Sequence, residues 1–216
     1  MRKSPMRLIL ALMLLTAPAC ADGALDPSAS ARPGAVTLYL QARELYTIGT
    51  LAKDPLTVLT AARLLRGLSL TDTPRQPDPA PAHRVALSPL DPVDMLNTAR
   101  LLDVGQVYLD LIEQVASDLQ AKPKSLAATA STLHPGHAET WTLTFYGGSP
   151  AELAFLGDGT SNLDLAVTAA DGTPICLDQG NADTARCGFT LRNNGAVKVT
   201  VKNVGDRADT YMLLTE

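Results

Sequence analysis

The chain has 216 residues, of which 46% are hydrophobic and 19% charged, a composition typical of a globular protein and not of a disordered or fibrous one. Its formal net charge is −4, which disfavours nucleic acid as a partner, because proteins that bind phosphate backbones are usually basic. Aromatic residues make up 4% and include a single tryptophan, so an extended stacking surface for bases or sugars is not expected.

The first 21 residues have the pattern of a secretory signal peptide. A basic start and an apolar run over residues 8–15 precede the small-residue cleavage site Ala19-Cys20-Ala21. The run is too short to span a bilayer, which takes about 20 apolar residues, and no later segment approaches that length. We therefore expect no transmembrane segment, cleavage near Ala21, a flexible segment over 22–35, and a mature protein in the periplasm or outside the cell. Cleavage removes three basic residues and no acidic one, which lowers the net charge to −7.

Cys20 provides an alternative to release of the mature protein by cleavage near Ala21. If it were lipidated, the mature protein would be anchored, as an outer-membrane lipoprotein is. The residues before Cys20 match a lipoprotein signal poorly, since Leu is favoured at the third position before the cysteine, whereas the Ala-x-Ala site is well formed. Cleavage at Ala21 is the prediction, and anchoring at Cys20 is the alternative.

The cysteine count agrees with export. Loss of Cys20 leaves an even pair, Cys176 and Cys187, separated by 11 positions. Exported proteins reach an oxidising compartment that permits disulfides, and neither cysteine lies in a Cys-x-x-Cys redox motif. A structural disulfide between neighbouring strands is therefore expected.

Residues 36–121 are predicted to form a small bundle of helical hairpins, because apolar residues recur at spacings of three and four and β-branched residues are few. A motif is duplicated: residues 54–65 and 91–102 are identical at seven of twelve positions. Each copy begins Asp-Pro, in which the Asp caps the helix and the Pro suits its first turn. The predicted hairpins pair 36–53 with 55–68, and 92–103 with 105–120.

Two segments of the chain are predicted to be connectors. Residues 71–91 contain five prolines, which disfavour both helix and central strand, so an exposed, partly extended loop is expected. Residues 122–133, rich in Ala, Ser and Thr, are predicted to be a linker. Arg63 and Arg100 occupy equivalent places in the two motif copies and are expected to pair with local acidic residues.

Residues 134–216 are predicted to form an antiparallel β-sandwich of about seven strands. Apolar residues alternate with polar ones, and Gly-containing turn signals recur every 8–12 residues. The fold class is therefore α+β, with a helical N-terminal part followed by an antiparallel sandwich. The predicted strands are 139–146, 151–157, 163–169, 174–178, 187–192, 196–203 and 209–215.

Residues 133–216 resemble the bacterial pre-peptidase C-terminal domain family. The likeness is carried by strand and turn motifs, whereas residues 22–132 resemble no family. It implies a jelly-roll-like sandwich of secreted bacterial proteins, one often attached to proteases and thought to aid secretion, substrate binding or stability, with no common catalytic residues. The motifs are Leu133-His-Pro-Gly136, Trp141–Gly148, Ala154–Gly159, Leu163-Asp-Leu165, Asp171-Gly172, Cys176 with Cys187 and Phe189, Val199–Asn203 and Tyr211–Thr215.

Two groups of residues could bind a metal ion, and each can also be explained as part of a turn. His134 and His137 with Glu139 form a His-x-x-His pair, but it straddles a Pro-Gly turn and lacks the ligand count of a zinc site. The acidic loops could hold calcium, the one cofactor considered, although Asp and Asn also satisfy turn backbones by hydrogen bonds. The candidate calcium ligands are Asp158, Asn162, Asp164, Asp178 and Asp183.

The sequence contains no Gly-x-Ser-x-Gly and no phosphate-binding glycine loop, so no catalytic residue is assigned. The prediction is a non-enzymatic binding or accessory module of the cell envelope. The sandwich would contact a peptide or glycan, and the helical part would hold a protein partner. The alternatives are an auxiliary or stability module for a separately encoded exported protease, a structural lipoprotein anchored at Cys20, and an enzyme of unknown class.

Overall fold

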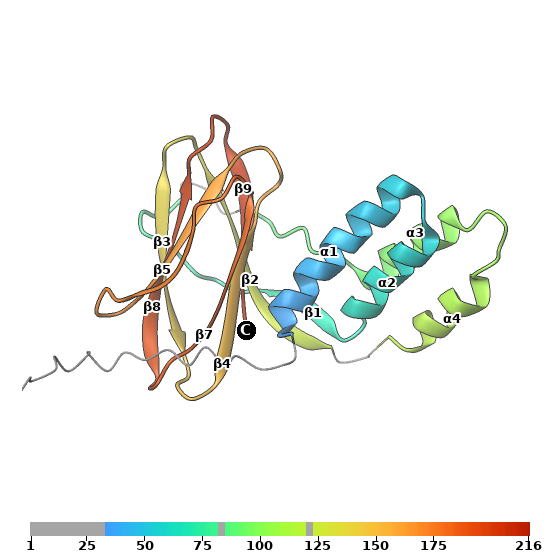
Figure 1. Cartoon of the computed structure of the whole chain (residues 1–216), viewed down its shortest axis with the longest axis horizontal. Coiled ribbons are helices and arrows are strands. Elements are labelled where there is room, and N and C mark those ends of the chain that lie inside the picture. The colour runs from blue at the N-terminus through green and yellow to red at the C-terminus, as the bar shows by residue number, and fades with distance from the viewer. Residues whose placement is uncertain (1–32, 82–84, 120–122) are drawn as a thin grey trace, which may run out of the picture.

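The computed structural model describes residues 33–81, 85–119 and 123–216. The molecule is elongated, with a β-sandwich at one end and a layer of helices at the other (Figure 1). The predicted signal peptide, its predicted cleavage site and Cys20 lie outside the described residues. No helix within the three described ranges combines the length and hydrophobicity needed to cross a lipid bilayer.

The helical layer contains two antiparallel pairs, as the duplicated motif predicts. Asp54 caps the second helix by accepting a hydrogen bond from the Leu56 backbone N–H (3.0 Å), and Asp91 caps the third in the same way through Val93 (2.8 Å). In both helices proline takes the first position, where its missing N–H costs nothing. The helices are α1 (Ala35–Ala52), α2 (Pro55–Leu65), α3 (Pro92–Leu102) and α4 (Leu109–Ser117).

The strands form two sheets that face each other. The five-stranded sheet has the order β1-β2-β9-β4-β7, and the four-stranded sheet has the order β3-β8-β5-β6. Every pairing is antiparallel except β1 with β2. The strands are β1 (Leu68–Asp72), β2 (Lys124–Leu133), β3 (Ala138–Phe145), β4 (Pro150–Leu156), β5 (Leu163–Ala169), β6 (Pro174–Asp178), β7 (Thr184–Thr190), β8 (Gly195–Asn203) and β9 (Asp209–Thr215).

The seven predicted strands correspond to β3–β9, and the fold class is confirmed. The linker predicted over 122–133 is wrong, since residues 124–133 form β2, which pairs with β9 in the interior of the sheet. Both faces of β2 are covered, one by helices and one by the second sheet, so small Ala, Ser and Thr residues replace the alternation of a half-exposed strand.

The segment predicted as an exposed loop over 71–91 is partly structured. Its first residues belong to β1, and residues 73–81 then run along the open side of the sandwich between β2 and β3. We call residues 73–81 the strap. The strap is bonded to β2 through the Thr73 N–H and the Ala128 carbonyl (2.8 Å), and Pro77 within it is buried.

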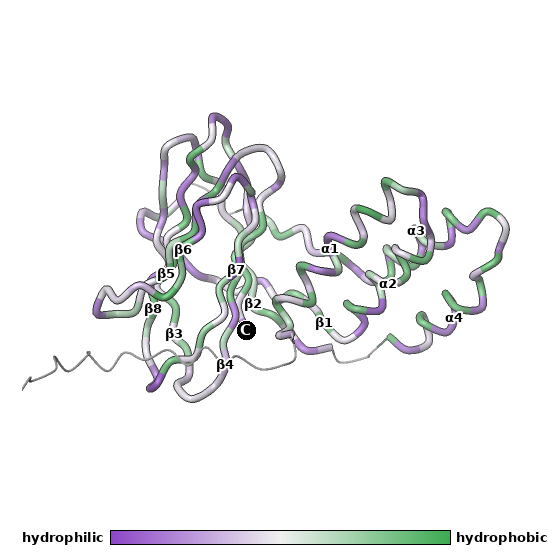
Figure 2. Tube along the Cα trace, in the orientation of Figure 1, coloured by the Kyte–Doolittle hydropathy of each residue, from purple (hydrophilic) through white to green (hydrophobic). Residues whose placement is uncertain are grey.

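Two apolar cores lie on opposite faces of the five-stranded sheet. One fills the space between the sheets and contains Trp141, Phe155 and Tyr211. The other joins the helices to the outer face of the sheet, where Leu126, Leu156 and Leu214 pack in one cluster with residues of all four helices. Figure 2 shows hydrophobic positions along the strands and also in the turn between α3 and α4, at the end far from the sandwich.

The sandwich also caps the first helix. The N-cap of α1 is Gly34, which offers no side chain, and carboxylates from the sandwich take its place. Glu152 of β4 accepts hydrogen bonds from the Thr37 N–H (3.0 Å) and hydroxyl (2.9 Å), and Glu216 accepts one from the Ala35 N–H. Negative charge at a helix N-terminus is stabilising, so the helical layer and the sandwich are joined by polar contacts as well as by a core.

Candidate functional site: the strap side of the sandwich

The side chains that line the candidate site come from the strap and from the two strands beneath it. The Asp78 backbone N–H donates to the Thr140 carbonyl and the Thr140 N–H donates to the Asp78 carbonyl, both at 2.9 Å, which fixes the strap to β3. Beyond the strap, Val85 forms an isolated antiparallel bridge with Ala130 of β2. Prolines suit such a segment, because an edge position leaves their missing N–H groups without a required partner.

Two cavities open along this side. The first, of about 390 Å³, has mostly apolar walls from the strap and β2, with Glu139, His134 and His137 among its lining residues. The second, of about 490 Å³, is lined by Pro74, Arg75, Gln76, Pro81, Thr129, Ala130 and Trp141. Pro81 lines both cavities, so they lie next to each other beneath the same segment.

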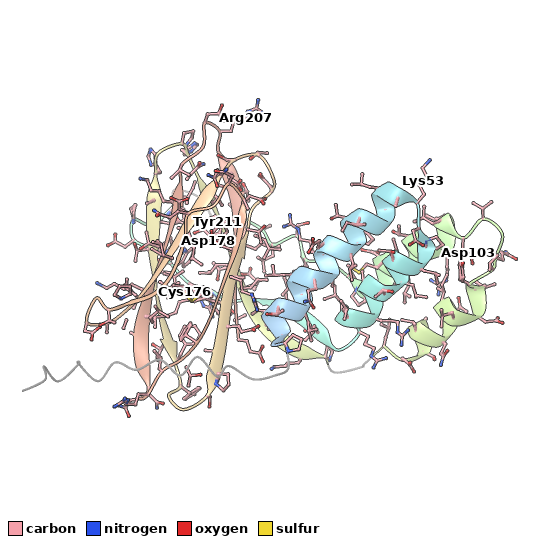
Figure 3. The ribbon with its side chains drawn as sticks, in the orientation of Figure 1. Lys53, Asp103, Cys176, Asp178, Arg207 and Tyr211 are labelled. Carbon is pink, nitrogen blue, oxygen red and sulfur yellow. A yellow bond between two sulfur atoms is a disulfide. The ribbon has the colours of Figure 1, made fainter. Side chains whose placement is uncertain are left out.

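A buried chain of hydrogen bonds runs beside the cavities. Glu139 is 3% exposed, and its carboxylate accepts from the Tyr211 hydroxyl and from the Ser131 hydroxyl (3.1 Å). The Tyr211 hydroxyl in turn accepts from the indole N–H of Trp141 (2.7 Å). Figure 3 labels Tyr211 within the sandwich. These hydrogen bonds thus link Glu139, which lines the first cavity, to Trp141, which lines the second.

Burial controls the ionisation of this network. Removal from water raises the pKa of the Glu139 carboxyl, and the bonds from Tyr211 and Ser131 oppose that rise only in part. Burial also raises the pKa of the Tyr211 phenol well above its ordinary value, and the adjacent Glu139 charge adds to the effect. Tyr211 therefore stays protonated and remains a hydrogen-bond donor to Glu139.

The three predicted metal ligands do line one cavity, but they do not form a cluster. The Glu139 carboxylate is engaged by Tyr211 and Ser131, and His134 and His137 lie edge to face with ring centroids 6.1 Å apart. In the described part of the chain, no group of three His, Cys, Asp or Glu side chains is placed to hold a metal ion. Metal binding by these residues stays a prediction.

The candidate calcium ligands are divided between turns and strands. Asp158 accepts bonds from the backbone N–H groups of Thr160 (3.0 Å) and Thr210 (3.1 Å), which is the turn-stabilising role, and Asp178 holds the Gly180 N–H (3.0 Å). Asp164 lies on β5, opposite Lys202 of β8 in the register. Asn162 and Asp183 flank β5 and β7 at their N-terminal ends. Calcium binding remains a prediction.

Asp209, at the start of β9, was not among the predicted residues. It is buried and accepts from the backbone N–H groups of Asp158 and Ser161, both at 3.1 Å. Burial raises the pKa of the Asp209 carboxyl, and the charges of Asp158 and Asp183 raise it further. The residue ties the β4–β5 turn to β9.

The predicted disulfide is confirmed. Cys176 of β6 is bonded to Cys187 of β7, with Cα atoms 6.0 Å apart. The two strands are consecutive in the chain but belong to different sheets, so the bond closes the side of the sandwich opposite the strap. Of the two equivalent arginines, Arg100 pairs with Glu113 (2.9 Å) as expected, whereas Arg63 lines an open groove beside the α1 N-terminus.

Comparison with known proteins gives similarity of fold alone. No protein-family model and no curated protein sequence matches the chain. A solved pre-peptidase C-terminal domain of a collagenase from Bacillus anthracis is 14% identical, covers 41% of this chain and 87% of its own, and has a TM-score of 0.37. A periplasmic inhibitor of g-type lysozyme from Aeromonas hydrophila is also 14% identical, covering 42% and 86%, with a TM-score of 0.32.

A family 16 carbohydrate-binding module is 14% identical, covers 39% of this chain and 72% of its own, and has a TM-score of 0.28. Membership of the pre-peptidase C-terminal family, suggested by the sequence motifs, stays a prediction at these low identities. What the chain binds has to be argued from its own residues.

Proposed function

We propose that this protein is an exported, non-catalytic binding module that holds its ligand on the strap side of the sandwich. The two adjacent cavities carry the proposal. Their volumes fall within the range of about 300–1,000 Å³ that is common for ligand sites. The walls of the first cavity are mostly apolar, whereas those of the second are polar and apolar in equal measure. Arg75 and Glu139 are the charged side chains that such a ligand would meet.

Export is supported by the covalent structure. The Cys176–Cys187 disulfide is of the kind that an oxidising compartment permits, and it suits the periplasm or the cell exterior. The signal peptide proposed for residues 1–21 would deliver the chain there.

A peptide is favoured over a glycan as the ligand. Sugar-binding surfaces usually offer exposed aromatic rings, but Trp141 is 1% exposed and bonded to Tyr211. In the described part of the chain, the largely exposed aromatic side chain is Tyr146 (79% exposed), on the β3–β4 turn and outside both cavities. The cavities instead suit the side chains or the end of a short peptide.

The test fills one cavity and leaves the rest of the protein unchanged. The mature chain, residues 22–216, is immobilised and exposed to proteolytic peptides and released glycans from the cell envelope of its host, and the retained material is identified by mass spectrometry. Ala80→Phe adds bulk to the wall of the first cavity, whereas Ala170→Phe adds the same bulk to an exposed turn as the control. Peptides should be retained by the wild type and by Ala170→Phe, but not by Ala80→Phe. Equal retention by all three proteins would contradict the proposed site.

A second candidate function, as an auxiliary subunit of a separately encoded exported protein, has its own observation. Leu101, Val104 and Val107 around the α3–α4 turn are largely exposed, with Val104 at 91%, as is Leu51 at the end of α1. This apolar end lies farthest from the sandwich, near the positions of Lys53 and Asp103 in Figure 3. Exposed apolar patches often mark protein interfaces.

This candidate is tested with Leu101→Glu and Val104→Glu in one chain. An exported protein that copurifies with the wild type should be lost from the double variant, while peptide retention on the strap side persists. If the same protein still copurifies with the double variant, the apolar end is not the interface. Anchoring through Cys20, the remaining alternative, is decided by the mass of the mature N-terminus.

A further inference from the structure

The strap inserts an arginine into the open side of the sandwich. Arg75 reaches between the sheets, where its Nη2 donates to the Thr215 hydroxyl (2.8 Å). Thr215 belongs to β9 and is itself buried. The other terminal nitrogen, Nη1, is buried too, and no acceptor within the described residues receives its N–H groups. A buried donor without an acceptor is costly, by about 1–3 kcal/mol.

Within the described residues, the charge of Arg75 is also uncompensated. Burial lowers the pKa of its guanidinium, and no charge in the described part of the chain contributes to that pKa in either direction. Glu139, a buried acid that lines the adjacent cavity, already accepts hydrogen bonds from Tyr211 and Ser131. Buried arginines in proteins are normally paired with a carboxylate, because an unpaired buried charge is strongly unfavourable. Arg75 is partly buried, so its guanidinium has both a buried donor and a charge that no described residue satisfies.

The surroundings of Arg75 set the chemistry of a partner. Its cavity of about 490 Å³ includes the Gln76 amide, which can donate a further hydrogen bond, and apolar surfaces of Pro74, Pro81 and Trp141. One guanidinium balances one negative charge, and the chain as a whole is negative, which disfavours multiply charged anions such as phosphate esters. Guanidinium groups bind carboxylates through parallel hydrogen bonds.

We propose that Arg75 and the cavity around it form a subsite for a single carboxylate group of the ligand. The inference deepens the proposed function and rests on it in one respect, since the carboxylate would be carried by the bound peptide. That group is either the C-terminal carboxylate of the peptide or an acidic side chain within it. Trp141 lines the same cavity and is the single tryptophan of the chain, so its fluorescence reports binding there.

The first experiment needs no natural ligand. Mature protein is titrated with sodium acetate and, separately, with acetamide, its neutral analogue, while Trp141 fluorescence and the Nε–H resonance of Arg75 are followed. Acetate should give a saturable change in both signals and acetamide should give none. Arg75→Gln should weaken the acetate response by about tenfold or more, whereas Arg207→Gln, on an exposed turn, should leave it unchanged.

The wild-type resonance decides the matter even if Arg75→Gln fails to fold. A flat Arg75 signal with acetate, or an acetate response shared equally by wild type and Arg75→Gln, would overturn the subsite.

The second experiment separates the subsite from the proposed function. Three pools of synthetic hexapeptides are compared: one with free C-termini, one with amidated C-termini, and one amidated pool in which Asn and Gln replace Asp and Glu. Loss of retention on amidation identifies the terminal carboxylate, and loss only in the third pool identifies an acidic side chain. Equal retention of all three pools overturns the subsite while the proposed function stands, and retention of none overturns the proposed function itself.

Discussion

On one side of the sandwich, β6 and β7 are joined by the Cys176–Cys187 bond, and on the other side β2 and β3 are spanned by the strap. The disulfide side is packed with apolar groups, including the buried Ala185, Cys187 and Phe189 of β7. The strap side instead holds cavities and ionisable side chains. The first closure is covalent, whereas the second is held by a few hydrogen bonds and leaves room for a ligand.

This difference suggests that the disulfide side serves stability and the strap side serves binding. A sandwich of this size gains from a staple, because the domain has a limited core of its own. A binding site, in contrast, needs polar groups that are incompletely satisfied in the free protein, and Arg75 on the strap side is one. Each prediction below concerns one of the two sides and is compared with a control elsewhere in the molecule.

The largest effect is expected from removing the disulfide. Cys176→Ala with Cys187→Ala, or reduction of the wild type, should lower the free energy of unfolding by about 3 kcal/mol, because the unfolded chain is no longer constrained by a loop of this length. Urea unfolding followed by circular dichroism measures the change. Retention of peptides should persist in the folded fraction. A loss of peptide binding equal to that of Ala80→Phe would mean that the two sides are not independent.

Tyr211→Phe should have the next largest effect. The change removes the hydroxyl that bonds both Glu139 and the Trp141 indole N–H, and it leaves two buried polar groups without that partner. We expect a loss of about 2 kcal/mol in the free energy of unfolding and a shift in Trp141 fluorescence. Tyr146→Phe, at an exposed tyrosine, is the matched control and should change neither quantity. An unchanged free energy of unfolding for Tyr211→Phe would show that these hydrogen bonds do not stabilise the fold.

Glu139→Gln should change how stability depends on pH. Since burial raises the pKa of Glu139, the folded state keeps its proton to higher pH than the unfolded chain does. The resulting stabilisation is complete below the ordinary glutamate pKa and is lost as pH rises through the raised value. Unfolding free energies measured across this window should therefore fall with pH more steeply in the wild type than in Glu139→Gln.

Exposed Glu44→Gln is the control for that pH series, and it should keep the wild-type slope. Asp209, whose pKa burial also raises, contributes equally to all three proteins and so cancels from the difference. Parallel slopes for wild type and Glu139→Gln would show that Glu139 is not protonated by burial.

The two sides also differ in how much of them the sequence predicts. Strands 163–169 and 174–178, which pair with each other on the disulfide side, have the bounds that the sequence predicts, because Gly-containing turns mark the ends of such strands locally. The pairing of Cys176 with Cys187 was predicted because they are the two cysteines that remain after the expected cleavage near Ala21. The disulfide side was therefore largely predictable from features close together in the chain.

The strap side depends on contacts that no local pattern encodes. β2 was missed because both of its faces are covered, and Arg75 was passed over because a proline-rich segment looks like a connector until its partner strands are known. The sequence singled out Glu139 only as a candidate metal ligand, but its buried position was predictable too: it shares the alternation of Trp141, Leu143 and Phe145, which places a carboxyl on the core face of β3. A charged residue at a core position was the available signal.

The smallest effect concerns local opening of the strap, which should leave global stability unchanged. Thr140 and Trp141 are neighbours on β3, and their backbone groups point to opposite edges, toward Asp78 of the strap and toward β8 respectively. Amide hydrogen exchange should therefore be much faster at Asp78 and Thr140 than at Trp141, because the strap is held by few bonds and can open without unfolding the sheet. Protection of Thr140 equal to that of Trp141 would mean that the strap opens only with the whole sandwich. A bound peptide should slow exchange at Asp78 and Thr140 while exchange at Cys187, beside the disulfide, stays the same, and this contrast would tie the ligand to the strap side.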